Sequence, residues 1–416
     1  MLSLCMIVKN EEGFLVECLQ SFKGIVDEII IVDTGSSDNT AEVALTNGAS
    51  IFNFKWIDDF SEARNFAISL AKGDWIFMPD ADDVLDSSAH DAVRQCIEDK
   101  SAWGYRIPVV HYSNDSKAPN WHAMKQPIKG FSGFLLTKAI KLFQNRKEIH
   151  YRFAVHESVR YSIEEHKGAI NDAPFVLHHY GSLRGKESRA GKHDYYLSLS
   201  LKDCARYPDH PKPFYEAGVA YFEKRMLKEA KDALERAAKN DERCFMPYHY
   251  LGEIALGENN LQQARALFEK SIKMHPEHAE THYALGVTAA KSGDTNSAKK
   301  ILTKALQMNN RSIRYFDTLV QLHLAQQELL PALALLYDAC ANTNNSLFLE
   351  KRQQLEHHIT GEAKRLLSYG PNETAYLWLA MVAVYQQDKV KSTELCRKAK
   401  KYFPNAPAFD AVTRMT

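Results

Sequence analysis

Acidic residues follow two apolar segments in the first quarter of the chain. The run 75–79 (Trp-Ile-Phe-Met-Pro) leads into the acidic cluster 80–83 (Asp-Ala-Asp-Asp), and the run 29–32 (Ile-Ile-Ile-Val) ends at Asp33. Carboxylates that follow neighbouring parallel strands meet at one edge of a sheet, where open α/β sheets bind their ligands. Hard oxygen ligands suit Mg²⁺ or Mn²⁺, and Mg²⁺ commonly shares its coordination with substrate phosphates. The residues therefore predict a metal–nucleotide site.

The segments around these acids alternate between two patterns. Apolar runs predict strands at 2–8, 29–32, 51–54 and 75–78, and helical spacing predicts helices at 14–22, 38–45 and 61–71. This alternation is typical of an α/β fold with a mostly parallel, Rossmann-like sheet. The stretch 111–138 is rich in Gly, Ser, Pro and Asn, so we expect a long irregular loop there, with aromatic residues that serve as packing or as walls for a sugar or an acceptor. A further helix is expected at 186–207.

A 34-residue repeat occupies the second half of the chain. Its phase is set by Gly218, Gly252 and Gly286 and is kept by three further sets: Ala230, Ala264, Ala298 and Ala332; Leu234, Phe268, Leu302 and Leu336; Ala237, Ser271, Ala305 and Ala339. A period of 34 resembles the tetratricopeptide repeat. We expect four regular units, an extra helix at 347–367 and a fifth unit.

The proline-rich segment 208–213 predicts a boundary, which gives an α/β domain at 1–207 and an all-α repeat domain at 208–416. Repeat solenoids present concave surfaces that bind peptides or proteins, or they support dimerisation. We therefore expect the repeats to recognise an acceptor, with a homodimer through the repeats as the alternative.

The composition excludes several classes of protein. Lys+Arg and Asp+Glu are both 52, so no net charge favours nucleic acid as a partner. No apolar run approaches the ~18 residues of a membrane span, so no transmembrane segment is expected. The seven cysteines form no C-x-x-C pair, which is typical of a reducing compartment. A cytoplasmic location is expected, with peripheral attachment to the inner face of the membrane as a variant.

Several short motifs together resemble the family 2 glycosyltransferases. They are Cys-Met-Ile-Val-Lys-Asn-Glu-Glu at 5–12, Ile-Val-Asp-Thr-Gly-Ser-Ser-Asp at 31–38, Asp-Phe-Ser-Glu-Ala-Arg-Asn at 59–65, Gly-Asp-Trp at 73–75, Asp-Ala-Asp at 80–82 and Val-His-Glu at 155–157. The resemblance covers roughly residues 1 to 200 and implies the A-type nucleotide-sugar fold. With the repeats, the chain is similar to a bacterial subgroup that includes the SunS-like enzymes, which glycosylate peptide cysteines. Other relatives modify lipopolysaccharide or proteins.

The resemblance implies roles for individual acids. Asp82 matches the second acid of the D-x-D motif and would bind Mg²⁺ or Mn²⁺, with Asp80 on the ribose or beside the metal. His179 matches a histidine that approaches the metal or the diphosphate. Asp33 lies where members contact the uracil or the ribose, although many members have a second acid where this chain has Thr34.

Other candidates have a structural reading as well as a functional one. Arg64 and Asn65 are either a solvated helix face or contacts to the donor, and arginine is a good partner for phosphate. Lys186 and Arg189 are either a helix face or part of a clamp on the diphosphate. The acids at 80–83 would also suit a strand-end turn followed by a helix cap.

The expected enzyme transfers a hexosyl or N-acetylhexosaminyl group from a UDP-sugar to a protein, peptide or glycan. Glu157 is the candidate base that removes the acceptor proton and His156 is its rival, since either group can act once its pKa is tuned. The resemblance implies a single displacement with inversion. A catalytically degenerate domain that acts as a protein-binding scaffold is the alternative. A nucleotidyltransferase ranks last, because 9–12 (Lys-Asn-Glu-Glu) replaces the Gly-rich loop of that class.

Overall fold

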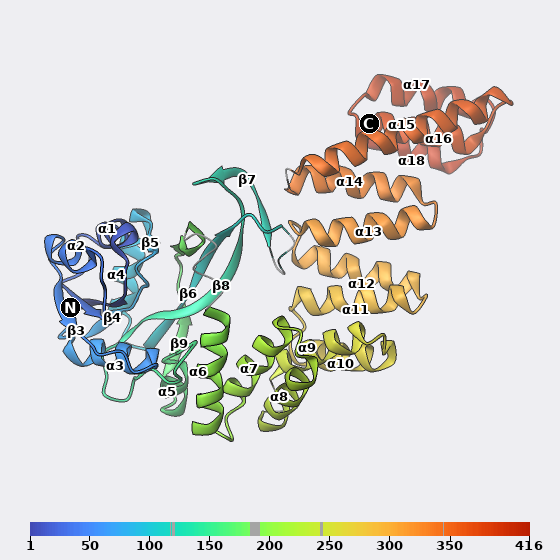
Figure 1. Ribbon diagram of the computed structural model, residues 1–416. Helices are drawn as coiled ribbons and strands as arrows, with labels where there is room; N and C mark the ends of the chain where they lie inside the picture. The colour runs from blue at the N-terminus through green and yellow to red at the C-terminus, as the bar shows by residue number, and fades with distance from the viewer. Residues whose placement is uncertain (117, 119–120, 184–191, 242–243, 344) are drawn as a thin grey trace. The chain divides into compact units, whose positions relative to one another are not determined.

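The computed structural model describes residues 1–116, 118, 121–183, 192–241, 244–343 and 345–416. Contacts divide the chain into two compact units. The first unit consists of Met1–Asn114 and Phe134–Pro276, and the second of Asp115–Gly133 and Glu277–Thr416. Figure 1 shows that strands occupy the N-terminal part of the chain and that helices follow one another from α6 to the C-terminus.

A mixed sheet of ten strands carries the N-terminal elements (Figure 1). The strands are β1 (Leu2–Val8), β2 (Glu28–Asp33), β3 (Ser50–Asn53), β4 (Trp75–Phe77), β5 (Asp83–Leu85), β6 (Ala102–Ser113), β7 (His122–Ile128), β8 (Phe131–Gln144), β9 (Ala169–Asp172) and β10 (Leu177–His179). Their order is β3-β2-β1-β4-β8-β6-β10-β5, with β7 on β8 and β9 on β6. Strands β1 to β4 pair in parallel, β6 pairs in parallel with β9 and β10, and β8 and β5 join antiparallel to β4 and β10. The expected mostly parallel α/β fold is confirmed.

Two apolar cores cover the two faces of this sheet. Strand β1 is buried on both faces, so Leu4 joins one core with α1 and α4, and Cys5 joins the other core with α3 and α5. Alternation along a strand sends successive side chains to opposite faces, which explains the near-continuous apolar run of β1. The helices of this part are α1 (Glu12–Ser21), α2 (Thr40–Thr46), α3 (Phe60–Leu70), α4 (His90–Glu98), α5 (Arg160–Glu165) and α6 (Lys192–Arg206), with short 3₁₀ turns at Ser87–Ala89 and Gly181–Leu183.

The prediction of a long irregular loop at 111–138 is wrong. Most of this stretch is a β-hairpin of β7 and β8, which follows the end of β6. The turn falls at Lys129 and Gly130, which both have positive φ. The Gly, Ser and Pro content that suggested a loop hides the strand alternation, and Gly133 accommodates the Trp121 ring, because a Cβ there would lie 2.0 Å from that ring.

The repeats form antiparallel helix pairs in the predicted 34-residue phase. The helices are α7 (Pro211–Glu223), α8 (Leu227–Asn240), α9 (Phe245–Gly257), α10 (Leu261–Met274), α11 (Ala279–Lys291), α12 (Thr295–Met308), α13 (Ile313–Ala325) and α14 (Leu329–Thr343). The repeated glycines allow each pair to approach closely. A Cβ on Gly252 would lie 2.6 Å from the Phe268 ring, and one on Gly286 would lie 2.5 Å from Leu302.

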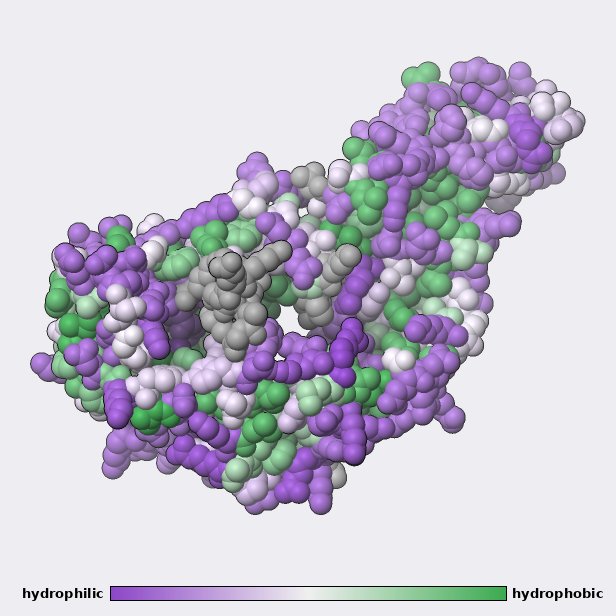
Figure 2. All heavy atoms as spheres, in the orientation of Figure 1, coloured by the Kyte–Doolittle hydropathy of each residue, from purple (hydrophilic) through white to green (hydrophobic). Residues whose placement is uncertain are grey.

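After the regular pairs the chain continues as α15 (Ser346–Ser368), α16 (Glu373–Tyr385), α17 (Lys389–Lys400) and α18 (Pro407–Met415). Helix α15 is the predicted extra helix, and α16 with α17 is the predicted resumed pair. In the parts of the chain that the structure describes, no helix is both long and apolar enough to span a bilayer. On the face drawn in Figure 2, hydrophilic and hydrophobic residues are interspersed over both units, as on most protein surfaces.

Candidate active site

Strand pairing brings a histidine to the acidic cluster. Strand β4 ends at Phe77, and the chain then turns through Asp80 and Asp82 before β5 begins at Asp83. Strand β10 pairs with β5 so that His179 lies opposite Asp83. On its other side β10 pairs with β6, which sets His111 beside His179 with ring centroids 4.7 Å apart. The structure thus brings His179 together with Asp82 and Asp83.

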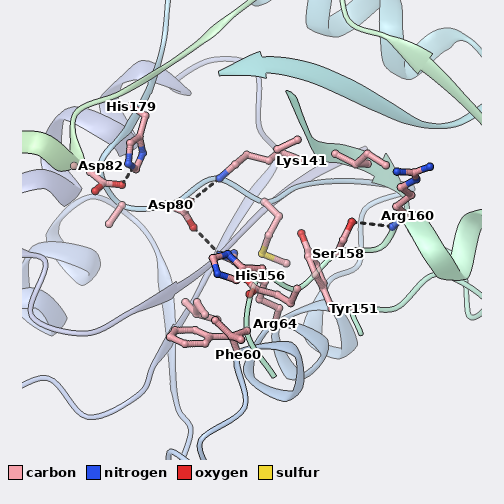
Figure 3. A pocket seen from close by; sticks show the side chains of 18 of the residues that line it. Phe60, Arg64, Asp80, Asp82, Lys141, Tyr151, His156, Ser158, Arg160 and His179 are labelled. Carbon is pink, nitrogen blue, oxygen red and sulfur yellow. Dashed lines mark hydrogen bonds and ion pairs between the residues drawn. The ribbon is translucent and has the colours of Figure 1, made fainter. Parts of the chain in front are cut away.

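These groups open into one large cleft of the first unit. Its volume is ≈1520 Å³, and its lining includes Asp80, Asp82, His179, Arg64 and Glu157. Figure 3 shows Asp82 beside His179, with Asp80 between Lys141 and Arg64. The cleft is larger than a typical pocket for one small molecule, which has a volume of roughly 300–1,000 Å³.

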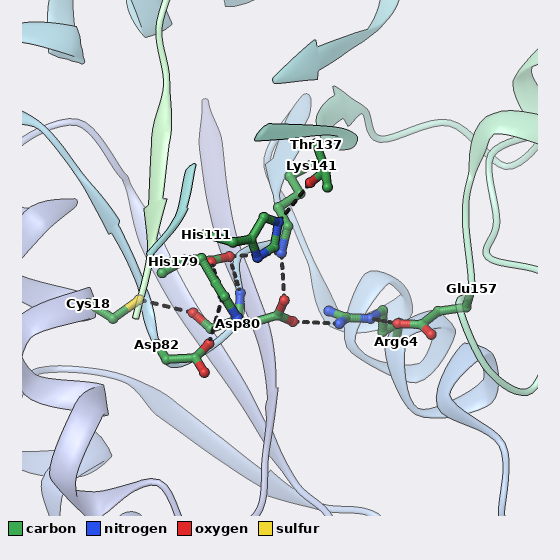
Figure 4. A network of polar contacts seen from close by, with 10 residues as sticks. Cys18, Arg64, Asp80, Asp82, His111, Thr137, Lys141, Glu157 and His179 are labelled. Carbon is green, nitrogen blue, oxygen red and sulfur yellow. Dashed lines mark hydrogen bonds and ion pairs between the residues drawn. The ribbon is translucent and has the colours of Figure 1, made fainter. Parts of the chain in front are cut away.

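Arg64, on the first half of α3, joins the acidic cluster to Glu157. Its Nη2 donates to Oδ1 of Asp80 at 2.6 Å, and its Nε donates to Oε1 of Glu157 at 2.5 Å (Figure 4). The third nitrogen, Nη1, is buried and has no partner among the described residues. Because a buried donor without a partner is costly, Nη1 is a ready contact for a ligand oxygen.

Lys141 of β8 holds the other side of the cluster. Its Nζ donates to Oδ2 of Asp80 at 2.7 Å and to Oδ2 of Asp83 at 2.8 Å. Burial alone would raise the pKa of Asp80, but Lys141 and Arg64 outweigh it and hold that pKa well below its usual range. Both oxygens of Asp80 are therefore engaged with cationic side chains.

The network as a whole carries more negative than positive charge. Four carboxylates, those of Asp80, Asp82, Asp83 and Glu157, face the two cations Arg64 and Lys141. Burial lowers the pKa of His179, yet its hydrogen bond to Asp83 and the charges of the cluster outweigh this, so the pKa is raised. A further cation would fit this environment.

The donor set suits a divalent metal. Asp80, Asp83 and His179 offer ligand atoms within 4.8 Å of one another. Asp82 also lies close, with Oδ1 3.3 Å from Nδ1 of His179. Of the acids at the cluster, Asp83 is fully buried and does not line the cleft, whereas Asp82 does, so Asp82 is better placed to share an ion with a ligand in the cleft.

Gly181 packs directly against these two side chains. A Cβ on Gly181 would lie 2.6 Å from Nε2 of His179 and 2.9 Å from Oδ2 of Asp82, so another residue here would displace one or both of them. Glycine therefore allows both side chains to keep their positions. The carboxylate of Asp82 and the imidazole of His179 fit a metal ion such as Mg²⁺ or Mn²⁺.

Two residues that were predicted to contact the donor, Asn65 and Asp33, make hydrogen bonds within the protein. Asn65 clamps the backbone of Tyr151 from both sides, because its Nδ2 donates to the carbonyl at 3.0 Å and its Oδ1 accepts from the amide at 2.7 Å. Oδ1 of Asp33 accepts from the amides of Gly35 and Ser36 at 3.0 and 2.8 Å. Neither residue belongs to the cleft lining, so their contacts to a donor stay predictions. Lys186 and Arg189 lie outside the described residues.

The two candidate bases occupy different surroundings. Glu157 is mostly buried against Arg64, whereas about half of the His156 side chain is exposed. His156 has a φ of 51°, and its Nε2 lies 3.7 Å from Oε2 of Glu216 on α7. A positive φ at a histidine is uncommon and marks a locally constrained loop.

Several cleft residues escaped the sequence-based prediction. Lys141, His111 and Tyr151 come from segments without a recognisable motif, and only the pairing of β8 with β4 and of β6 with β10 brings the first two to the site. Burial lowers the pKa of His111 to about 4, so this imidazole is neutral near pH 7. The guanidinium of Arg64 lies 5.5 Å from the Tyr151 ring centroid.

The fold and this site define an α/β enzyme with an acidic cluster in a large cleft, joined to helical repeats. Residues 3–160 match the model of glycosyl transferase family 2, and residues 255–322 match a tetratricopeptide repeat model. The chain therefore carries a family 2 glycosyltransferase domain and tetratricopeptide repeats, as the sequence motifs predicted. It is a glycosyltransferase.

Three relatives are similar to different shares of this chain. A TPR repeat-containing protein of Synechococcus elongatus is 29% identical over 81% of this chain and 73% of its own length. An uncharacterized glycosyltransferase of Rickettsia typhi is 27% identical over 49% of this chain and 68% of its own. The glycosyltransferase SunS of Bacillus subtilis is 22% identical over 60% of this chain and 56% of its own.

Proposed function

We propose that this protein is a metal-dependent, inverting glycosyltransferase that moves a hexosyl or N-acetylhexosaminyl group from a UDP-sugar to a protein, peptide or glycan. The observation that carries the proposal is the pair Asp82 and His179, whose Oδ1 and Nδ1 lie 3.3 Å apart in a cleft that Glu157 also lines. A cytoplasmic location remains a prediction from the cysteine pattern.

Asp82 and His179 would hold Mg²⁺ or Mn²⁺ at the edge of the cleft. When bound, the ion would neutralise charge that develops on the leaving diphosphate. Asp80 would act beside the metal or on the ribose, since Arg64 and Lys141 fix the orientation of its carboxylate. The buried Nη1 of Arg64 supports a contact to a donor oxygen, because arginine binds phosphate oxygens well.

Glu157 is proposed as the base that takes the proton from the attacking acceptor group. The ion pair with Arg64 keeps the carboxylate in place beside the acidic cluster, so base and donor site are linked through one side chain. His156 stays the rival base, oriented by Glu216. A single base that activates the acceptor implies one displacement at the anomeric carbon, and therefore inversion.

The repeats are proposed to recognise a macromolecular acceptor, with dimerisation as the second role. Stacked helix pairs offer an extended surface for partner chains. On α11 and α13 of the second unit, the partly exposed Arg314 lies over Tyr283, which stacks on the buried Tyr315 at 4.8 Å. Substitutions of exposed residues on these helices that leave acceptor affinity, transfer rate and oligomeric state unchanged would refute this role.

The test is a turnover assay with defined donors. Purified protein is incubated with UDP-, GDP- and dTDP-linked hexoses and N-acetylhexosamines, with Mn²⁺ or with excess chelator, and release of the nucleoside diphosphate is measured. We expect release from a UDP-sugar with Mn²⁺, and loss of release in chelator and in Asp82→Asn. Equal release in chelator contradicts the metal, and no release from any donor supports the scaffold alternative.

A further inference from the structure

We propose that four aromatic side chains in the cleft form an acceptor subsite that binds the pyranose ring of a glycan. The four are Trp56, Phe60, Tyr195 and Tyr196, which we call the aromatic wall. The proposal rests on the proposed glycosyltransferase function and names the chemical class of its acceptor. Among these residues, Phe60 lies in the motif at 59–65, and the other three lie outside the quoted motifs. Trp56 and Phe60 lie around the start of α3, and the two tyrosines lie on α6.

The rings of the aromatic wall contact one another in a chain. The centroids of Trp56 and Phe60 are 4.7 Å apart, those of Phe60 and Tyr196 6.1 Å, and those of Tyr196 and Tyr195 6.2 Å. The imidazole of His156 continues the chain at 5.9 Å from Tyr196. All four rings are half-buried and line the same cleft as Glu157, so they lie near the group that would deprotonate an acceptor.

The polar edges of two of these rings are engaged within the protein. Nε1 of Trp56 donates to the hydroxyl oxygen of Tyr195 at 2.8 Å, and the Tyr195 hydroxyl donates to Oδ1 of Asp58 at 2.7 Å. Burial and this bond raise the pKa of Tyr195 to about 12, so the hydroxyl keeps its proton. Trp56 and Tyr195 therefore present the carbon atoms of their rings to a ligand rather than their polar groups.

Buried apolar residues and an ion pair hold the aromatic wall in position. Ala154, Val155 and Leu199 are buried beneath Phe60 and the two tyrosines. Helix α6 is tied to the start of α3, because Arg206 pairs with Asp59 at 3.2 Å. Rings held in place before binding lose little conformational entropy when a ligand arrives, which favours binding.

A sugar ring matches this surface better than an extended peptide does. Pyranose rings present C–H bonds on a face, which suit the electron-rich faces of aromatic rings, and hydroxyls at the edge, which suit Glu157 and His156. An extended peptide would need unpaired backbone groups, but two amides at the start of α3 are engaged. Phe60 donates its amide to the Ala154 carbonyl at 2.9 Å, and Glu62 donates its amide to Asp59.

The experiment measures binding of methyl β-pyranosides of glucose, galactose and N-acetylglucosamine by saturation-transfer NMR, without a donor. We expect saturation transfer to ring C–H protons of at least one glycoside. Phe60→Leu keeps an apolar side chain and removes the ring, and Trp56→Ala removes the largest ring. Each should raise the Kd at least about tenfold. Phe60→Tyr, which keeps the ring, should bind as the wild type does.

Tyr369→Ala is the matched control, because this tyrosine is 83% exposed in the second unit. It should leave binding unchanged. The proposal is overturned if no glycoside binds, if Phe60→Leu and Trp56→Ala bind as the wild type does, or if a blocked serine-, threonine- and cysteine-containing peptide binds instead. A raised Kd for the UDP-sugar alone would assign the wall to the donor and overturn it too. Release of the diphosphate with Mn²⁺ tests the underlying function separately.

Discussion

Replacing Lys141 by methionine should destabilise the first unit strongly. The Lys141 side chain is 12% exposed and makes ion pairs with Asp80 and Asp83, and Asp83 is fully buried. Removing one partner of a buried ion pair costs about 3–5 kcal/mol, since the other charges stay in a poorly solvated site. Asp80 keeps Arg64 and Asp83 keeps His179, so we expect a loss near the lower end, about 3 kcal/mol.

Lys138→Met provides the matched control on the same strand. Lys138 is 53% exposed and pairs with the exposed Asp172 at 3.2 Å, so its removal should cost ~0–1 kcal/mol. In scanning calorimetry, each kcal/mol should lower the melting temperature of a unit of this size by ~2–4 °C. Lys141→Met should therefore melt about 6–12 °C below the wild type. If the two variants melt alike, the buried network does not stabilise the fold as described.

Three further predictions concern the base, a buried acid and the repeats. Glu157→Gln should lower kcat by orders of magnitude with little change in donor affinity, because a base acts in the transition state. If instead His156→Ala lowers kcat in this way and Glu157→Gln stays active, His156 is the base. Burial raises the pKa of Asp203 to about 6, and its Oδ2 accepts from the Ala154 amide at 2.7 Å. A raised folded pKa favours the protonated native state, so the wild type should lose about 2–3 kcal/mol relative to Asp203→Asn between pH 4 and 7 in urea titrations; parallel pH profiles would contradict this. Gly252→Ala should destabilise the repeats by ~1–3 kcal/mol in thermal melts, because the added Cβ meets the Phe268 ring. The control is Gly257→Ala on the same helix, whose Cβ meets nothing within 4 Å and which should be neutral or stabilising. Equal effects of the two substitutions would exclude close packing as the cause.

Local patterns sufficed for the first strands and for the repeats. The run 2–8 predicts β1 because its continuous apolarity requires burial on both faces, and the structure buries Leu4 and Cys5 in opposite cores. The glycines that recur every 34 residues were equally informative, because each one lies where its helix contacts a large side chain of the next helix. In the first case the information lies within the strand itself, and in the second it lies in the recurrence of the same residue types every 34 positions.

The hairpin at 111–138 was misread because turn-forming residues are mixed with strand residues. Gly133 reads as a loop signal, but here it makes room for the Trp121 ring within strand β8. Such a glycine can be recognised only when its cross-strand neighbour is known.

The sequence indicates those site residues that lie in a recognisable motif. It does not indicate those that reach the site only through the pairing of distant strands. Asp82 follows a strand and is visible in the sequence, whereas Lys141 arrives from β8, which is antiparallel to β4. Arg64 was expected to bind the donor, and the structure adds that it already joins Asp80 to Glu157. That link depends on side-chain geometry, which no spacing in the sequence encodes.

The proposed metal site can be tested by a titration of Mn²⁺ followed by electron paramagnetic resonance, with and without UDP. We expect the wild type to remove free Mn²⁺ from solution, more tightly with UDP, and Asp82→Asn to lose this binding. Gly181→Ala should lose it as well, because the added methyl would displace the side chains of His179 and Asp82 while every ligand residue remains. Gly361→Ala, with nothing within 4 Å, should bind as the wild type does. Unchanged Mn²⁺ binding in both Asp82→Asn and Gly181→Ala would contradict the proposed metal site.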